Sequence, residues 1–192
     1  CACYHAPAML PVAGTQSAIQ ALPRLRAPSC VVVAAPSYAE HAHHWGQHGH
    51  SLRHVPYAQL ANAVDSCDVM VVCNPNNPTG AHIAPEVLLD WANRLAQRGG
   101  WLVVDEAFGD TEAQAGLGPH AGQPGLIVLR SVGKFFGLAG LRLGFVAAHP
   151  ELLGKLADML GPWTVSGPAQ QVALAALTDA RWQDAMRLRL RE

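Results

Sequence analysis

The chain has 192 residues, half of them apolar, and its 13 basic and 14 acidic residues leave a net charge of −1. This length suffices for one domain with a sizeable core. The balanced charge excludes a protein whose main partner is nucleic acid, because binding to a phosphate backbone requires a basic surface. No apolar run reaches the roughly 18 residues of a transmembrane helix, so we expect no membrane partner.

The five cysteines form no Cys-x-x-Cys pair. Cys30 and Cys73 lie in or beside apolar runs, where a reduced, buried thiol is the ordinary interpretation. We therefore expect a reducing, cytoplasmic compartment. The sequence starts at Cys1, without Met and without a basic leader, which leads us to expect a fragment with no signal peptide.

The first predicted strand covers residues 8–12 and ends at Gly14, after which Thr15 and Gln16 open a helix that ends near Pro23. A glycine turn before polar residues at a helix N-terminus presents free backbone amides to an anion. A plain N-cap is the alternative, and for these residues in isolation it is the more common arrangement.

The next predicted strand, residues 30–35, is followed by Tyr38 at the start of a helix. Open α/β sheets bind ligands beyond the carboxyl ends of their strands, so this tyrosine is placed to contact one. The alternative is a packing aromatic with its hydroxyl at the surface. A strand over residues 51–55 and a short helix over residues 57–65 are predicted to follow.

Six histidines crowd the same region: His41, His43, His44, His48, His50 and His54. His44 and His48 are four residues apart, as in a helical zinc pair. No carboxylate or thiolate pattern in the sequence completes the ligand set, and Gly46 and Gly49 weaken the helix. We therefore interpret the histidines as an ordinary solvated helix face and predict no metal site.

Residues 68–73 form a continuous apolar run that predicts a buried strand, and the Asn/Pro/Gly cluster at 74–80 predicts a turn after it. A helix over residues 85–98 leads to another buried strand, residues 101–104, with Asp105 at its carboxyl end. An acid that emerges from a hydrophobic strand is costly unless a cation pairs with it. A helix cap or a turn acid is the alternative.

The glycine-rich loop 130–144 combines a hydroxyl, an amine and a guanidinium. Ser131 and Arg142 can hold a phosphate, Arg142 through its planar fork of donors. Lys134 lies between them and can form a Schiff base with an aldehyde if its amine is desolvated. The Gly-x-x-x-x-Gly-Lys-Ser/Thr order of a P-loop is missing, so that alternative fails. A lysine and two phosphate anchors suggest pyridoxal phosphate.

The remaining predicted elements are a polar loop over 110–124, strands over 126–129 and 143–147, helices over 150–160, 169–177 and 182–192, and a link over 163–168. The last helix is basic and amphipathic. Strands that alternate with helices predict an α/β fold, a mostly parallel sheet with helices on both faces.

The Ser-x-x-Lys spacing, with Arg eight residues after the lysine, resembles the lysine loop of fold-type-I pyridoxal-phosphate enzymes, and more narrowly the aspartate aminotransferase superfamily. The resemblance implies the fold of the large domain of these enzymes. It also implies that Lys134 holds pyridoxal 5'-phosphate and that Ser131 and Arg142 bind the phosphate group.

Three further segments resemble the superfamily. Gly14, Thr15 and Gln16 match the Gly-Ser/Thr-x-x-Ala-Ile segment that cups the cofactor phosphate. Tyr38 matches the aromatic that stacks on the pyridine ring, and Asn77 matches the asparagine that donates a hydrogen bond to the phenolate oxygen, which a neutral amide can do without adding charge.

Asp105 matches the catalytic acid that keeps the pyridine nitrogen protonated and so preserves the ring's capacity to accept electrons. Phe108 departs from the pattern, because many aminotransferases have a tyrosine there whose hydroxyl bonds the phenolate oxygen. The electronics of the bound cofactor are therefore expected to differ, and transaminase activity is less secure than cofactor binding.

Within the superfamily, residues 104–110 and 129–145 are similar to the threonine-phosphate decarboxylases of cobalamin biosynthesis, with which Phe108 agrees. The similarity implies decarboxylation of O-phospho-L-threonine to aminopropanol phosphate, with Lys134 returning a proton to Cα. Histidinol-phosphate aminotransferase activity is the alternative, and a regulator domain that only binds the cofactor is a third.

The matches to the superfamily span residues 8–178. We expect a large cofactor-binding domain over residues 1–162 that is truncated at its N-terminus. Residues 163–192 are expected to be a linker and the start of a truncated C-terminal small domain. The resemblance further implies a homodimer, since a neighbouring subunit contributes to the site in these enzymes.

Overall fold

The computed structural model describes residues 2–112 and 116–191. Cys1, residues 113–115 and Glu192 lie outside the described part, and with them the middle of the loop predicted over 110–124 and the end of the last predicted helix. Within the two described ranges, no helix is both long enough and apolar enough to cross a membrane.

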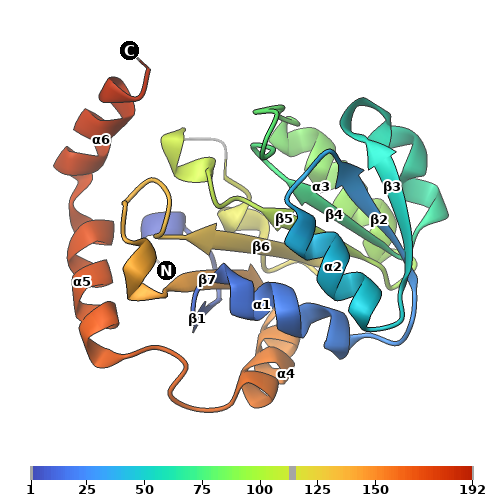
Figure 1. The fold of residues 1–192 in the computed structure, drawn as a ribbon, viewed down its shortest axis with the longest axis horizontal. Coiled ribbons are helices and arrows are strands. Elements are labelled where there is room, and N and C mark those ends of the chain that lie inside the picture. The colour runs from blue at the N-terminus through green and yellow to red at the C-terminus, as the bar shows by residue number, and fades with distance from the viewer. Residues whose placement is uncertain (1, 113–115, 192) are drawn as a thin grey trace.

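The described residues form one sheet of seven strands in the order β1-β7-β6-β5-β4-β2-β3 (Figure 1). The strands are β1 (Met9–Val12), β2 (Cys30–Ala35), β3 (Ser51–Pro56), β4 (Val69–Cys73), β5 (Trp101–Asp105), β6 (Leu126–Ser131) and β7 (Gly144–Ala148). β2 to β6 are parallel, whereas β7 pairs antiparallel with both β6 and β1. The predicted, mostly parallel sheet is confirmed.

The α-helices are α1 (Thr15–Ala21), α2 (Ala39–Gln47), α3 (Pro85–Ala96), α4 (Pro150–Leu160), α5 (Gly167–Thr178) and α6 (Ala180–Arg189). Short 3₁₀ helices are η1 (Ala2–Tyr4), η2 (Leu22–Leu25), η3 (Tyr57–Ser66), η4 (Gly109–Thr111), η5 (Gly118–His120) and η6 (Ala139–Leu141). Side chains of α1, α2 and α4 pack on one face of the sheet, and those of η3 and α3 pack on the other. The expectation of helices on both faces is confirmed.

The central strand β4 shows why its sequence is continuously apolar. Val69 and Val71 point into the core beneath α1, α2 and α4. Met70 and Val72 point into the core beneath η3 and α3. Successive side chains of a strand point to opposite faces, so a strand covered on both faces needs apolar residues at every position.

The segment predicted as a short helix over residues 57–65 is helical, in the form of the 3₁₀ helix η3. Pro56 precedes the segment, and Ser66 Oγ donates to the carbonyl oxygen of Ala63, three residues back, at 3.1 Å. Serine and asparagine side chains compete for backbone groups in this way, which disfavours a regular α-helix.

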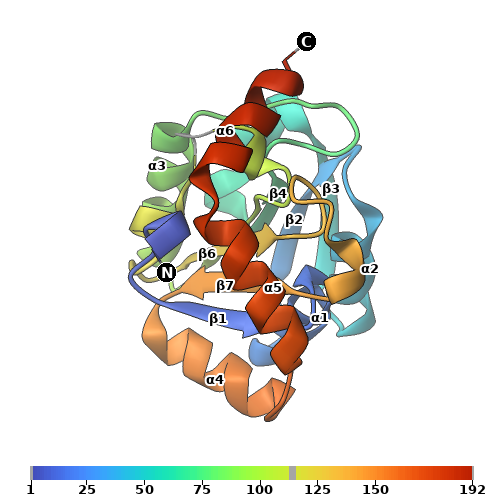
Figure 2. The ribbon, with the colours of Figure 1, turned by 90° about the vertical axis from the view of Figure 1, so that its left-hand side faces the viewer.

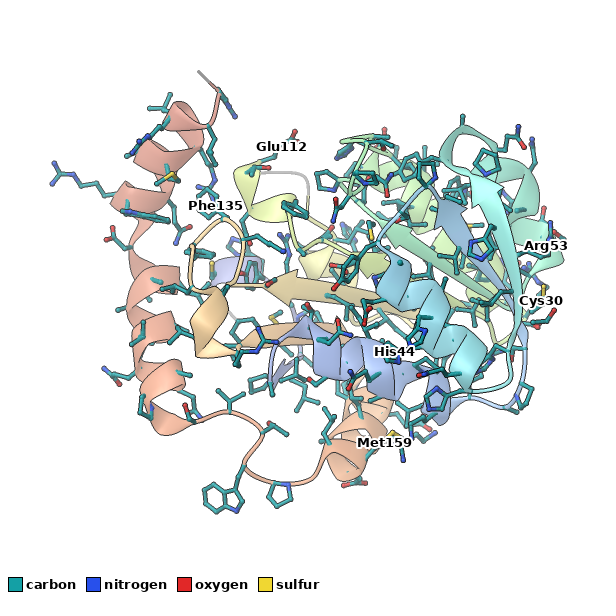
Figure 3. The ribbon with its side chains drawn as sticks, in the orientation of Figure 1. Cys30, His44, Arg53, Glu112, Phe135 and Met159 are labelled. Atoms are coloured by element: carbon teal, nitrogen blue, oxygen red, sulfur yellow. The ribbon has the colours of Figure 1, made fainter. Side chains whose placement is uncertain are left out.

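α5 and α6 lie beside the edge of the sheet formed by the ends of β6 and β7 (Figure 2). They share a third apolar cluster with the loop after β6, which includes Phe135, Phe136 and Ala173. Figure 3 labels Phe135 in that loop, and its ring centroid lies 5.5 Å from that of Trp182 on α6. These contacts fix the loop that carries Lys134 between β6 and α6.

Parallel pairing brings the carboxyl ends of β4, β5 and β6 to one edge of the sheet. Cys73, the last residue of β4, is in register with Asp105, the last residue of β5, and Asp105 is in register with Leu129 of β6. The loops that follow these strands therefore start side by side, as in other open α/β sheets that bind ligands there.

We expect Leu102→Ala to lower the free energy of unfolding by about 2–5 kcal/mol, because the substitution leaves a cavity in a packed core. Leu102 is fully buried on β5, between β4 and β6. Leu188→Ala on α6, where the side chain is 66% exposed, is the matched control and is expected to change stability little. Urea unfolding of both variants measures the difference, and equal losses would contradict the packing assignment.

Candidate active site

A cavity of about 340 Å³ opens at the carboxyl edge of the sheet. Every residue predicted to contact the cofactor lines it: Gly14, Thr15, Gln16, Tyr38, Asn77, Asp105, Ser131, Lys134 and Arg142. Cys73, Pro75, Ala107, Phe108, Gly133, Ala139 and Leu143 complete the lining. A volume of this size is in the usual range for a small-molecule site.

Asp105 is buried, with 5% of its surface exposed, and its carboxylate is held by two neighbours. Oδ1 accepts a hydrogen bond from the backbone amide of Ala107 at 3.0 Å. Oδ2 lies 2.9 Å from Nε2 of His41, which reaches it from α2 and is itself buried. The carboxylate is thus fixed at the wall of the cavity. A buried acid needs a cation beside it, and His41 is one such partner of Asp105.

His41 is the partner that holds this charge in place. Burial alone would lower the pKa of its imidazole, but the hydrogen bond that the ring donates to Asp105, its hydrogen bond with Cys73 and the charge of Asp105 raise this pKa to about 10. At neutral pH the ring is therefore an imidazolium, and Asp105 and His41 form a buried ion pair.

Glu106, the next residue after Asp105, points away from the cavity. Its Oε2 lies 2.9 Å from Nη2 of Arg130, and its Oε1 accepts a hydrogen bond from the amide of Leu117 at 2.9 Å. Burial raises the pKa of Glu106 to about 7, although Arg130 opposes the shift. Of the two adjacent acids, only Asp105 lines the cavity.

Arg142 lies against the turn at Gly14. Gly14 has a φ of +77°, and a Cβ built there would lie 2.7 Å from Nη2 of Arg142. Glycine is required both by this backbone conformation and by the close guanidinium. Within the described residues no side chain caps α1, so the first amides of this helix and the guanidinium of Arg142 border one cavity. This donor set suits a phosphate.

Lys134 and Ser131 reach the cavity from the end of β6 and the loop after it. Nζ of Lys134 lies 5.4 Å from the ring centroid of Phe108, and Lys134 is exposed. The described residues thus do not desolvate its amine, which was the condition for a reactive lysine. Ser131 is buried, and its Oγ accepts a hydrogen bond from the amide of Gly133 at 3.1 Å.

The loop after β4 carries three asparagines, of which two bind backbone groups and one lines the cavity. Asn74 binds both backbone groups of Ile83, and Asn76 donates to the carbonyl oxygen of Pro36 at 3.0 Å. Both are buried. Asn77 lines the cavity, and its amide has no hydrogen-bond partner in the described parts of the chain. Its donors therefore remain available to a ligand.

The prediction that the histidines are solvated is wrong for three of them. His41 and His44 on α2, and His50 between α2 and β3, are buried. His44 is labelled in Figure 3, and its Nε2 lies 3.3 Å from Nε2 of Gln16. Gln16 also donates to Glu40, and the hydroxyl of Tyr38 donates to Oε1 of Gln16 at 3.4 Å. α2 packs this face against the sheet and α1, so its polar side chains pair with each other.

Two residues of this site, His41 and Cys73, were not predicted from the sequence to take part in it. His41 lies one helical turn after Tyr38, so both face the same way, and their ring centroids are 6.1 Å apart. Cys73 ends β4 beside Asp105, and it forms a cluster with His41 and Asp105 in which the ligand atoms all lie within 4.8 Å of one another. The i, i+3 spacing could have identified His41, but the contact of Cys73 depends on strand order.

Comparisons with known proteins identify the family of the chain. The family "Aminotransferase class I and II" matches residues 4–192. A threonine-phosphate decarboxylase from Pseudomonas aeruginosa is 55% identical over 183 residues, which are 95% of this chain and 55% of the relative. A threonine-phosphate decarboxylase from a Sinorhizobium species is 51% identical over 170 residues, 88% of this chain and 50% of the relative.

A solved structure extends the likeness to a cofactor complex. The histidinol-phosphate aminotransferase of Sinorhizobium meliloti, in complex with pyridoxal-5'-phosphate, has a TM-score of 0.83 and 27% identity, and the match covers 94% of this chain and 52% of that one. The chain spans about half the length of the curated relatives that it matches.

We expect the stability lost on His41→Asn to be greatest below about pH 6.5, the ordinary pKa of histidine, and to shrink as pH rises toward 10. The folded protein holds the proton of His41 more tightly than the unfolded chain. This contribution is complete below the unfolded pKa and is lost as pH passes the folded one. Urea unfolding of both proteins between these limits tests the trend, and a constant difference would contradict the buried ion pair.

Proposed function

Because the chain belongs to the aminotransferase class I and II family, we propose that it binds pyridoxal 5'-phosphate and forms the cofactor-binding part of a threonine-phosphate decarboxylase. The convergence of Asp105, Lys134 and Arg142 on one cavity carries the cofactor assignment. The identity of 55% to a decarboxylase supports the reaction. Its substrate is O-phospho-L-threonine, and its product is the aminopropanol phosphate used in cobalamin biosynthesis.

We assign the large cofactor domain to residues 1–162, and a linker with the start of a small domain to residues 163–192. The chain covers about half of each decarboxylase relative. We therefore infer that the groups that bind the substrate carboxylate and phosphate lie elsewhere in the whole protein. The whole protein acts in the cytoplasm as a homodimer, in which the partner subunit completes the site.

The residues near the Gly14 turn would bind the cofactor phosphate. Arg142 supplies the paired charge, and Ser131 and Thr15 supply hydroxyl donors. Gly14 and Gln16 complete this part of the wall, and Gly14 keeps the space free of a Cβ.

The residues at the ends of β4 and β5 would orient the ring. Asp105 pairs with the pyridine nitrogen and holds its proton, while His41 holds the carboxylate in place. Asn77 donates to the phenolate oxygen through its free amide, and Tyr38 stacks on the ring. When bound, the cofactor supplies a conjugated ring that accepts electrons from the substrate Cα.

Lys134 would act twice through Nζ. It anchors the cofactor before the substrate enters, and after the carboxylate has left as carbon dioxide it returns a proton to Cα. Phe108, whose ring lies beside Nζ of Lys134, adds no hydroxyl donor to the site. The small domain and a partner subunit would exclude water from this lysine, which the described residues leave exposed.

Histidinol-phosphate aminotransferase activity is the second candidate. The structure of the histidinol-phosphate aminotransferase of Sinorhizobium meliloti is similar to the chain, with a TM-score of 0.83 and 27% identity. The higher identity to the decarboxylases favours the first candidate. A regulator domain that binds the cofactor without catalysis is a third.

We expect Arg142→Gln to raise the dissociation constant for pyridoxal phosphate about 10- to 100-fold, since a hydrogen bond to a charged group contributes about 1.5–3 kcal/mol. Arg53→Gln is the matched control, because Arg53 lies on the edge strand β3 and donates to Ser66. Titration of the metal-free apoprotein, followed by the visible absorbance of the bound cofactor, measures both. An unchanged affinity in Arg142→Gln would contradict the phosphate assignment.

The reaction is tested with the whole protein, pyridoxal phosphate and O-phospho-L-threonine. We expect carbon dioxide without a keto acid, and we expect Lys134→Ala to abolish its release. Lys155→Ala serves as the control, because Lys155 is exposed on α4 and pairs with Glu151.

The alternative products separate the three candidates. A keto acid formed from histidinol phosphate would replace the decarboxylase by the aminotransferase. Cofactor absorbance without either product would favour the regulator domain. Failure to bind the cofactor at all would overturn the whole assignment.

A further inference from the structure

His41, Cys73 and Asp105 form a compact set of metal-ligand types in the wall of the cavity. They come from three elements: His41 from α2, Cys73 from the end of β4 and Asp105 from the end of β5. Their ligand atoms, one nitrogen, one sulfur and one oxygen, lie within 4.8 Å of one another, and all three residues are buried.

The distances in this set are close to those of a metal centre. In a tetrahedral zinc site with bonds of about 2.0–2.3 Å, neighbouring ligand atoms are about 3.3–3.7 Å apart. Nε2 of His41 and Oδ2 of Asp105 are 2.9 Å apart, so the hydrogen bond between them has to open slightly to admit a cation. The sulfur of Cys73 lies at most 4.8 Å from the other two ligand atoms. It therefore has to move toward them by no more than about 1 Å to reach the spacing of a zinc site.

The surroundings favour a cation that prefers nitrogen and sulfur. Thiolate and imidazole select Zn²⁺ over Mg²⁺ or Ca²⁺, which prefer oxygen. Oδ1 of Asp105 is oriented by the amide of Ala107, which fixes the carboxylate for coordination. Cys73 and Asp105 line the cavity, so its interior is open to a fourth ligand such as water.

We propose that His41, Cys73 and Asp105 bind a thiolate-preferring divalent cation such as Zn²⁺ when the cavity holds no cofactor. On binding, the thiol of Cys73 and the imidazolium of His41 each release a proton to solvent, and the cation gains sulfur, nitrogen and carboxylate ligands. No electron transfer is involved.

The cation and the organic cofactor exclude each other, because both need the carboxylate of Asp105. This part of the proposal rests on the proposed function, in which Asp105 pairs with the pyridine nitrogen. Zinc would then hold the protein in a form that cannot load its cofactor. Metal binding itself depends only on the three side chains.

The test is titration of the whole protein, freed of cofactor and of metals, with Co²⁺ as a spectroscopic probe for Zn²⁺. We expect one Co²⁺ per chain with a thiolate-to-cobalt charge-transfer band. Zn²⁺ is expected to displace the Co²⁺, and prior loading with pyridoxal phosphate is expected to prevent the band.

Two variants assign the ligands. Cys73→Ser is expected to abolish the charge-transfer band and to weaken Co²⁺ binding by at least about tenfold, since even outer-shell changes cost this much. His41→Asn is expected to weaken binding similarly while the band persists at saturating Co²⁺. Circular dichroism of each variant verifies the fold.

Two control variants are expected to behave as the unmodified protein. Cys67→Ser removes another buried thiol, whose Sγ contacts the carbonyl oxygen of Val64. His48→Gln removes a histidine that lies four residues after His44. Nδ1 of His48 lies 2.8 Å from the carbonyl oxygen of His44.

Three results would overturn the metal site: no charge-transfer band in the unmodified protein, a band that survives Cys73→Ser, or a band that Cys67→Ser removes. Simultaneous binding of Co²⁺ and pyridoxal phosphate would overturn their mutual exclusion. A cobalt band in a protein that never binds pyridoxal phosphate would overturn the proposed function and support the metal site.

Discussion

The buried ion pair between Asp105 and His41 is the constraint on which the rest of the site depends. A carboxylate at the end of a strand that is covered on both faces stays charged only with a cation beside it. His41 supplies that cation from α2, at 2.9 Å. The position of α2 on the sheet, anchored by the fully buried Trp45, is therefore as important to the site as the strand that carries Asp105.

Parallel strand order then decides which loops share the cavity. β4, β5 and β6 end at one edge, so the asparagine loop, the turn after Asp105 and the lysine loop lie next to one another. Arg142 joins them because β7 returns antiparallel beside β6 and brings it against the turn that precedes α1. The cavity thus combines one fixed anion with two cationic side chains, an arrangement that suits a ligand with a cationic nitrogen and an anionic phosphate.

The proposed cofactor and the proposed metal ion would both bind to the carboxylate of Asp105. Asp105 can pair with a pyridinium or coordinate a cation, and Cys73 and His41 stand beside it in either case. In the proposed complex, the neighbours of the cofactor nitrogen would therefore also be the ligands of the proposed metal ion. The exposed Lys134, in contrast, takes no part in the metal cluster.

The sequence by itself determined the strands, the class of the sheet and nine of the residues that line the cavity. Short branched-aliphatic runs bounded by Gly or Pro predict buried strands, and each superfamily motif is recognised from residues that are adjacent in the sequence. Only the tertiary structure decided the role of His41 and Cys73 and the burial of His44, because these depend on which strands are neighbours and how α2 packs. The 3₁₀ form of the helix predicted over 57–65 is also visible only in the structure, since local side-chain hydrogen bonds compete with α-helical ones.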